Sequence, residues 1–198
     1  MRISIRLLSL TGMCCALAAT VLAQTAPEPI ITGQATSLSG FAGVASDSHN
    51  GGSVLGGSAG WDFTPALTLE GGGAWVSRTK GPDAFTGALK LRVAFRGRDH
   101  MAPFIAVGPG LYRVSFAGGG AKVPEFYRAR MLAGMDGGRT KRTFMDPSFV
   151  FGGGINLFVN RQVAVRPSLE AMLVFRDAKR QMITTAGIAF AYHFEHGR

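Results

Sequence analysis

Apolar residues recur at every second position through most of the sequence after residue 35, and this period limits the possible folds more than any other feature. Successive side chains of a β-strand point to opposite faces, so a period of two predicts strands whose two faces differ. The segment 182–194 shows the pattern most clearly, because Phe190, Tyr192 and Phe194 share one parity and the residues between them are small or polar. The sequence therefore predicts an all-β protein.

Eight segments carry this pattern, and most are close to the length of about 9–11 residues that a tilted strand needs to cross a bilayer. They are 36–46, 52–63, 66–76, 84–95, 103–115, 148–159, 163–175 and 182–194. The links between them mostly alternate between short and long, which favours an up-and-down antiparallel order. The longest link is 116–147, in which Pro124 and Gly134 bracket one or two expected helical turns at 125–133. The link 176–181 is the exception, because it is short where a long one is expected.

The large aromatic residues indicate which face points outward. They lie near the ends of the segments, where a lipid interface favours aromatic rings. They are Trp61, Phe63, Trp75, Phe85, Phe95, Phe175 and Phe194. The opposite face holds mainly Gly, Ala, Ser and Thr with isolated charges, whereas a surface in water would carry far more Lys and Glu. We therefore expect an eight-stranded antiparallel up-and-down transmembrane β-barrel, and the alternative is a soluble periplasmic, lipocalin-like barrel that binds a small molecule.

The N-terminal residues have the pattern of a cleaved secretory signal peptide, because Arg2 and Arg6 precede an apolar stretch that ends in small residues before Gln24. Both cysteines, Cys14 and Cys15, lie in this segment, so we expect no disulfide or thiol chemistry in the mature chain. Loss of two arginines leaves a net charge of (21 − 2) − 12 = +7. The expected organisation is a signal peptide at 1–23, a leader at 24–35, the barrel at 36–194 and a periplasmic tail at 195–198.

A signal peptide, eight glycine-rich alternating strands and a last strand that ends Phe190-Ala191-Tyr192-His193-Phe194 resemble the small outer-membrane β-barrel proteins, the group that includes the OmpA-type transmembrane domain and OmpX-like proteins. The resemblance implies a location in the bacterial outer membrane. It also implies that Phe190, Tyr192 and Phe194 form the signal that the barrel-assembly machinery recognises. In this chain four further residues follow the last aromatic residue, at 195–198.

Five charged residues fall on the polar parity of their segments, and we expect them inside the barrel: Glu70, Lys90, Arg92, Arg166 and Glu170. Charges in a dry lumen must be paired, because an unpaired buried charge costs several kcal/mol. The sequence therefore predicts a luminal salt-bridge network that plugs the barrel, in which Glu170 pairs with Arg166 or Arg92. The alternative is a charged constriction that selects anions, although eight strands leave interior space only for side chains.

The sequence gives little indication of catalysis, of a metal or of a cofactor. The four histidines have no Cys or carboxylate partners at zinc-ligand spacing, and His193 is expected at the rim of the lumen. None of them begins a His-x-Ser pattern, which lipid A deacylases carry on one strand, and no glycine run contains Gly-Lys-Ser/Thr. We therefore expect no enzyme activity, and an outer-membrane enzyme that modifies lipids is a third alternative.

The link 116–147 is the place for a specific activity at the cell surface. Its basic residues are Lys122, Arg128, Arg130, Arg139, Lys141 and Arg142. They are expected either to contact lipopolysaccharide phosphates or to be simply solvated. Nucleic acid is not an expected partner, because no stacking platform accompanies the charges. We expect a monomer in contact with outer-membrane lipid, with a structural or surface-interaction role in the cell envelope.

Overall fold

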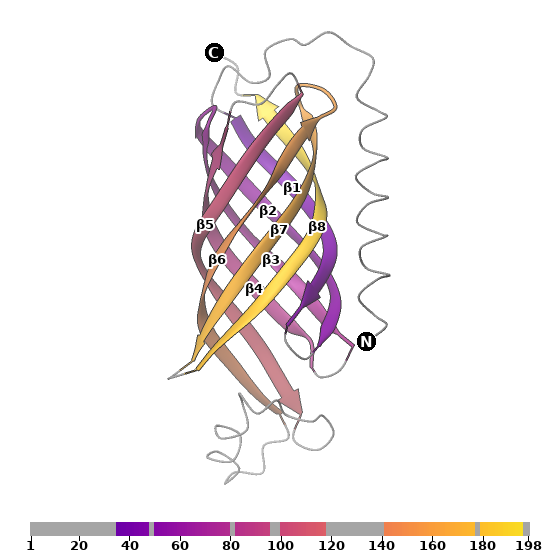
Figure 1. Ribbon diagram of the computed structural model, residues 1–198, viewed down its shortest axis with the longest axis vertical. Coiled ribbons are helices and arrows are strands. Elements are labelled where there is room, and N and C mark those ends of the chain that lie inside the picture. The colour runs from indigo at the N-terminus through magenta and orange to yellow at the C-terminus, as the bar shows by residue number, and fades with distance from the viewer. Residues whose placement is uncertain are drawn as a thin grey trace, which may run out of the picture.

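The protein is a closed barrel of eight antiparallel strands (Figure 1), as the sequence predicts. The computed structural model describes residues 35–47, 50–79, 82–95, 100–117, 141–176 and 179–195. The strands are β1 (Ala35–Ser46), β2 (Gly51–Thr64), β3 (Leu67–Arg78), β4 (Ala84–Ala94), β5 (Met101–Ala117), β6 (Lys141–Phe158), β7 (Val163–Arg176) and β8 (Lys179–Glu195). Each strand pairs with its neighbours in sequence, and β1 pairs with β8 to close the barrel.

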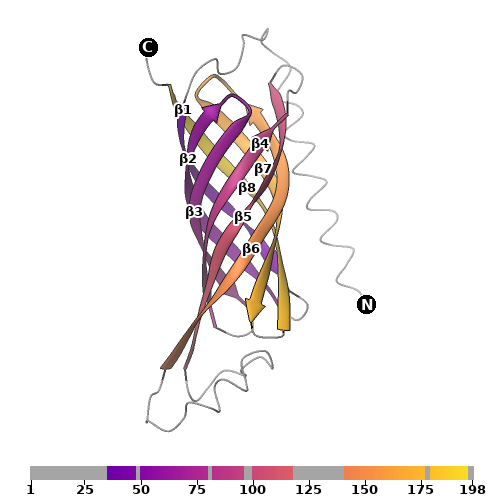
Figure 2. The same cartoon turned by 90° about the vertical axis from the view of Figure 1, so that its left-hand side faces the viewer.

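The two ends of the barrel differ, and we name them by what they carry. The terminal end holds the start of β1, the end of β8 and the connections near residues 65, 97 and 161. The opposite end, which we call the loop end, holds the connections that include 118–140. At the loop end β5 and β6 project past the other strands, as Figure 2 shows.

The start of β6 corrects the sequence-based prediction. β6 begins at Lys141 rather than at 148, and its first residues pair with β5, from Lys141 opposite Ala117 to Pro147 opposite Leu111. The expected link 116–147 is therefore shorter than predicted, and the expected helical turns at 125–133 lie outside the described residues. The extension is stabilised from inside, because the Phe144 ring packs edge-on against the Phe116 ring at 5.9 Å. The link 176–181 is also shorter, since Lys179 pairs with Arg176.

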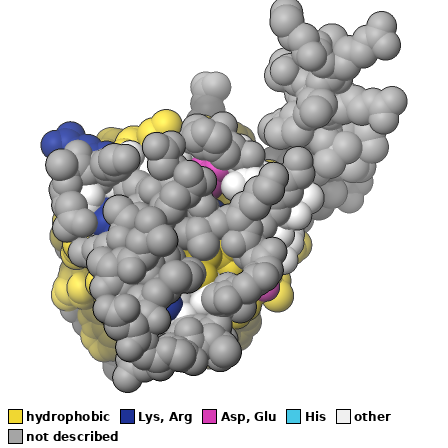
Figure 3. Space-filling view, turned by 90° about the horizontal axis from the view of Figure 1, so that it is seen from below, with side chains coloured by type: hydrophobic (Ala, Val, Ile, Leu, Met, Phe, Trp, Pro, Cys, Tyr) yellow, Lys and Arg dark blue, Asp and Glu magenta, His cyan; other side chains and the backbone are white. Residues whose placement is uncertain are grey.

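The outward face of the barrel is apolar. Leu55 and Phe190 expose 69% and 65% of their surface, although both are large and hydrophobic. The seven aromatic residues that the sequence places near strand ends are all exposed as well. Figure 3, which views the molecule from the loop end, shows hydrophobic side chains along the flank of the barrel. This arrangement is the reverse of a soluble barrel, in which the large apolar parity would point inward.

The inward face is more apolar near the loop end than the sequence suggests. A cluster of buried side chains there includes Tyr112, Val114, Phe116, Phe144 and Val174. Ile183, a large residue among the mostly small and polar side chains at the odd positions of β8, joins this cluster and is 4% exposed. Apolar packing therefore occupies much of the barrel near the loop end, and the five charged residues that the sequence places in the lumen lie further toward the terminal end.

Candidate functional site

Glu70 is the centre of the charged cluster inside the barrel. It lies on β3, directly opposite Lys90 of β4, and its side chain points into the lumen. Nη1 of Arg92, also on β4, lies 2.7 Å from Glu70 Oε2. Nη1 of Arg166 reaches the same oxygen at 3.0 Å from β7. One carboxylate therefore holds two buried guanidinium groups that come from opposite walls of the barrel.

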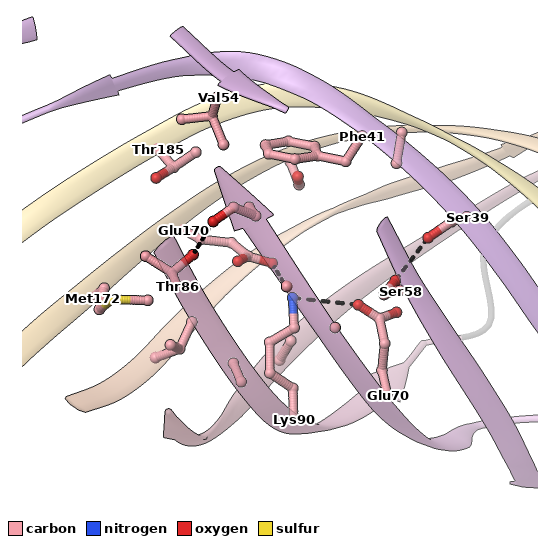
Figure 4. Close-up of a pocket in the computed structure, with 18 of the residues that line it drawn as sticks. Ser39, Phe41, Val54, Ser58, Glu70, Thr86, Lys90, Glu170, Met172 and Thr185 are labelled. Atoms are coloured by element: carbon pink, nitrogen blue, oxygen red, sulfur yellow. Dashed lines mark hydrogen bonds and ion pairs between the residues drawn. The ribbon is translucent and has the colours of Figure 1, made fainter. Parts of the chain in front are cut away.

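Lys90 joins the second carboxylate to the cluster. Its Nζ lies 2.7 Å from Glu170 Oε1 and 3.3 Å from Glu70 Oε1, so it bridges the two acids (Figure 4). Glycine makes room for Glu170, because a Cβ at Gly152 would lie 2.7 Å from the Glu170 Cα and 2.9 Å from its Cγ. The five residues expected from parity therefore form one connected set of ion pairs.

The partner of Glu170 differs from the expected one. Glu170 lies against Lys90, whereas both arginines are held by Glu70. Parity gives the face of each side chain but not its position along the barrel axis, which depends on strand tilt and stagger. The long Lys90 side chain spans the remaining distance to β7.

The two arginines share further contacts that the sequence did not indicate. Both guanidinium carbons lie 5.7 Å from the centre of the Phe104 ring. Arg166 Nε donates to Asn156 Oδ1 at 2.7 Å, and Arg92 Nη2 donates to Thr68 Oγ1 at 3.3 Å. Cation–π contacts of this kind stabilise a desolvated guanidinium in addition to its ion pairs.

His193 is buried and does not lie at an open rim. It is 3% exposed, because β8 continues to Glu195 and the Phe158 ring lies 5.8 Å from the imidazole. Its Nδ1 lies 3.9 Å from Asp62 Oδ2, and Asp62 in turn accepts a hydrogen bond from Thr68. Parity predicted the face of His193 correctly, but not its depth.

A second polar group, which the sequence analysis missed, lies at the loop end. Arg78 Nη2 contacts Asp47 Oδ2 at 3.3 Å and donates to the Tyr112 hydroxyl at 2.7 Å. Arg176 lies beside Asp146, with Nε 3.6 Å from Oδ1. Arg176 shares the even parity of the other luminal charges on its strand, and this signal was available in the sequence.

A cavity of about 110 Å³ adjoins the charged cluster. Charged and hydroxyl side chains and a similar number of apolar side chains line it. Figure 4 shows Glu70, Lys90 and Glu170 among them. Among the hydroxyls, Ser39 Oγ and Ser58 Oγ lie 2.7 Å apart. A space of this size with charged groups in its wall has room for several water molecules. Within the described residues, no group of three or more His, Cys, Asp and Glu side chains is placed to hold a metal ion.

Comparison with known proteins identifies the fold. No protein-family model matches the sequence, and no curated protein matches it significantly. Solved structures do match: Neisserial surface protein A superposes with a TM-score of 0.62 at 13% identity, over 82% of this chain and 99% of its own. The fold is that of a small outer-membrane β-barrel.

Two further outer-membrane barrels show the same likeness. The N-terminal β-barrel domain of Pseudomonas aeruginosa OprF has a TM-score of 0.55 at 11% identity, over 80% of this chain and 97% of that domain. Ail, the attachment invasion locus protein of Yersinia pestis, has a TM-score of 0.52 at 14% identity, over 83% of this chain and 100% of its own. Among the described residues, no helix is long and apolar enough to span a membrane.

The structure places only part of the expected basic patch. Lys122, Arg128, Arg130 and Arg139 lie outside the described residues, and Lys141 is described only as the first residue of β6. The Arg142 guanidinium lies 5.4 Å from the centre of the Phe144 ring.

The three expected assembly-signal residues lie on the outward face of β8. Phe190, Tyr192 and Phe194 are 65%, 40% and 48% exposed. The Tyr192 and Phe194 rings meet edge-on at 4.8 Å. The Tyr192 hydroxyl also donates to Gln162 Oε1 at 3.2 Å, which joins the end of β8 to the turn before β7. These side chains are therefore accessible from outside the barrel wall.

Proposed function

We propose that this protein spans the bacterial outer membrane as a monomeric, non-enzymatic barrel with a structural or surface-interaction role in the cell envelope. The observation that carries the proposal is the apolar outward face of a closed barrel. Even the shortest strand, β4, has 11 residues, which is enough for a tilted strand to cross the hydrocarbon core. Closure also pairs the backbone groups of every strand with a neighbour, as lipid requires.

The proposed orientation follows from the two ends. In outer-membrane barrels the short turns are periplasmic and the longer loops are extracellular. The terminal end, where Ala35 pairs with Glu195, would thus face the periplasm. The loop end, with the long connection 118–140, would face the outside, after export directed by a cleaved signal peptide.

The charged cluster supports a closed lumen rather than a pore. Glu70 has three cationic neighbours within 3.3 Å, and its side chain is 8% exposed. These pairs cross the lumen between β3, β4 and β7, so they obstruct passage along the axis. The pairing of these side chains with one another is consistent with a structural role for the cluster.

Surface contact would take place through the loop end. The basic residues of the link 118–140 give it a positive charge that suits lipopolysaccharide phosphates. The outward aromatic residues of β8 suit recognition by the barrel-assembly machinery, because a last strand is an open edge until the barrel closes.

Membrane fractionation followed by electrophoresis with and without heating tests the proposal. We expect the protein in the outer-membrane fraction, and we expect detergent to be needed to extract it. Its electrophoretic mobility should differ between unheated and boiled samples. A protein that stays dispersed without detergent would instead be the soluble periplasmic barrel. Release of an acyl chain from radiolabelled envelope lipid would contradict the non-enzymatic role.

A further inference from the structure

The outward face carries very few charges, and they lie at one end of the barrel. Among the outward-facing strand residues that the structure describes, Arg113 of β5 and Arg180 of β8 are charged, and both are exposed. Both lie near the loop end, where β5 ends at Ala117 and β8 begins at Lys179. At the terminal end, the outward strand positions hold uncharged residues such as Trp61 and Phe194. The two charges are thus of one sign and at one end.

Each arginine sits beside an exposed aromatic ring. Arg113 is the cross-strand partner of Phe85, which is 46% exposed. Arg180 is the cross-strand partner of Phe175, which is 37% exposed. Aromatic rings mark the level of the lipid headgroups on an outer-membrane barrel. The guanidinium groups therefore lie at the headgroup level of the leaflet at the loop end.

Within the part of the chain that the structure describes, neither guanidinium has an acidic partner. Arg113 and Arg180 form no ion pair there, in contrast to the luminal arginines. A permanent charge on the lipid-facing wall is costly near the bilayer centre and becomes tolerable only at the interface. The counter-charge must therefore come from the membrane, and guanidinium groups match phosphate geometry particularly well.

We propose that Arg113 and Arg180 bind the phosphate groups of lipid A in the leaflet at the loop end. This inference rests on the proposed outer-membrane location and names the lipid contacts of the barrel wall itself, apart from those of the long loop. The apolar neighbours of each arginine, such as Leu111 beside Arg113, lie against the acyl chains of the same lipid. Because both outward charges are positive, the lipid that they bind is expected to be anionic. Because the described outward positions at the terminal end are uncharged, the site is confined to the leaflet at the loop end.

Lipid titration of the refolded full-length chain tests this inference. The barrel is refolded in a neutral detergent and titrated with bis-phosphorylated lipid A, with fully dephosphorylated lipid A and with phosphatidylglycerol, and the bound fraction is measured by native mass spectrometry. The variants are Arg113→Gln, Arg180→Gln, their combination and the corresponding lysine substitutions. The matched control is Arg161→Gln, which removes an exposed arginine from the turn at the terminal end.

We expect each glutamine substitution to weaken binding of bis-phosphorylated lipid A about fivefold, which corresponds to ~1 kcal/mol for a basic residue near an anionic surface. The double variant is expected to lose about 25-fold, the lysine variants to retain most of the affinity, and Arg161→Gln to bind normally. Unchanged binding by the double variant would overturn the inference. Equal binding of the dephosphorylated lipid would exclude phosphate as the ligand, and equal binding of phosphatidylglycerol would exclude lipid A as its source.

This experiment is separable from the test of the proposed function. A wild-type chain that shifts on heating and partitions into outer membranes, but shows no preference for bis-phosphorylated lipid A, would contradict only the inference about Arg113 and Arg180. A chain that never enters membranes would contradict both.

Discussion

Replacement of Glu70 by glutamine should destabilise the barrel more than any other single charge removal in the luminal network. Glutamine keeps the volume but removes the carboxylate that lies 2.7 Å from Arg92 and 3.0 Å from Arg166. Those guanidinium side chains are 4% and 5% exposed, so bulk solvent does not reach them to replace the lost carboxylate. Breaking a buried ion pair of this kind costs about 3–5 kcal/mol.

Glu170→Gln is the matched control, because it makes the same chemical change on the other acid. Glu170 contacts Lys90 alone among the network cations, its side chain is 27% exposed, and Lys90 keeps Glu70 as a partner. After allowance for solvent screening we expect a loss of about 1 kcal/mol. The assay is urea unfolding of the barrel refolded in lipid vesicles, followed by the fluorescence of the two outward tryptophans, Trp61 and Trp75.

A double-mutant cycle identifies the contact responsible. Adding Arg92→Gln to Glu70→Gln should cost less than the sum of the two single changes, with a coupling of about 0.5–3 kcal/mol. The same cycle with Glu170→Gln should be nearly additive, since Glu170 does not contact Arg92. The reasoning is refuted if Glu170→Gln costs as much as Glu70→Gln, or if the Glu70–Arg92 cycle is additive.

Three other changes test different parts of the structure. Leu89→Lys places a charge on the outward face, where Leu89 is 50% exposed, so refolding yield in vesicles should drop with a cost of about 2–4 kcal/mol, and an unchanged yield would mean that this face does not meet lipid. Phe194→Ala should sharply lower heat-modifiable protein in cells while deletion of 195–198 should not, and the opposite result would show that the assembly signal lies elsewhere. Gly108→Ala should destabilise the barrel in urea unfolding, because the added Cβ would overlap the backbone of β4. Gly40→Ala is the control and should be neutral, since nothing lies within 4 Å of its added Cβ. Equal effects of the two substitutions would argue against the close approach of β4 and β5.

The period of two was sufficient to predict which face each side chain takes. Arg166 and Glu170 point inward and Trp61 points outward, as their parity requires. Even Ile183, a large residue among the mostly small side chains at the odd positions of β8, points inward and is buried. The alternation of side chains is a local property of an extended chain, so it does not depend on how neighbouring strands pair.

The position of each side chain along the barrel axis could not be predicted in the same way. Whether Glu170 meets Lys90 or Arg92 depends on the tilt and stagger of β7 against β4, and no local pattern records these. The depth of His193 depends in the same way on Phe158, which comes from another strand.

Strand boundaries failed where local composition looks like a loop. Pro147 and the charged residues at 141–142 interrupt the apolar pattern, yet β5 and β6 continue as a hairpin beyond the rest of the barrel. The inward Asp146 and Arg176 were missed for the same reason, because they lie at the end of the barrel where the sequence pattern had been read as a link.

Quenching of the native tryptophans tests the central claim, the outward direction of the apolar face, most directly. The chain has two tryptophans, and Trp61 and Trp75 are 47% and 52% exposed on the outside of the barrel. In vesicles whose lipid acyl chains are brominated, the account predicts blue-shifted emission that bromine quenches strongly and that aqueous iodide leaves nearly unchanged. Emission that iodide quenches and brominated lipid does not would show that these side chains face water, and would contradict a barrel that spans the membrane.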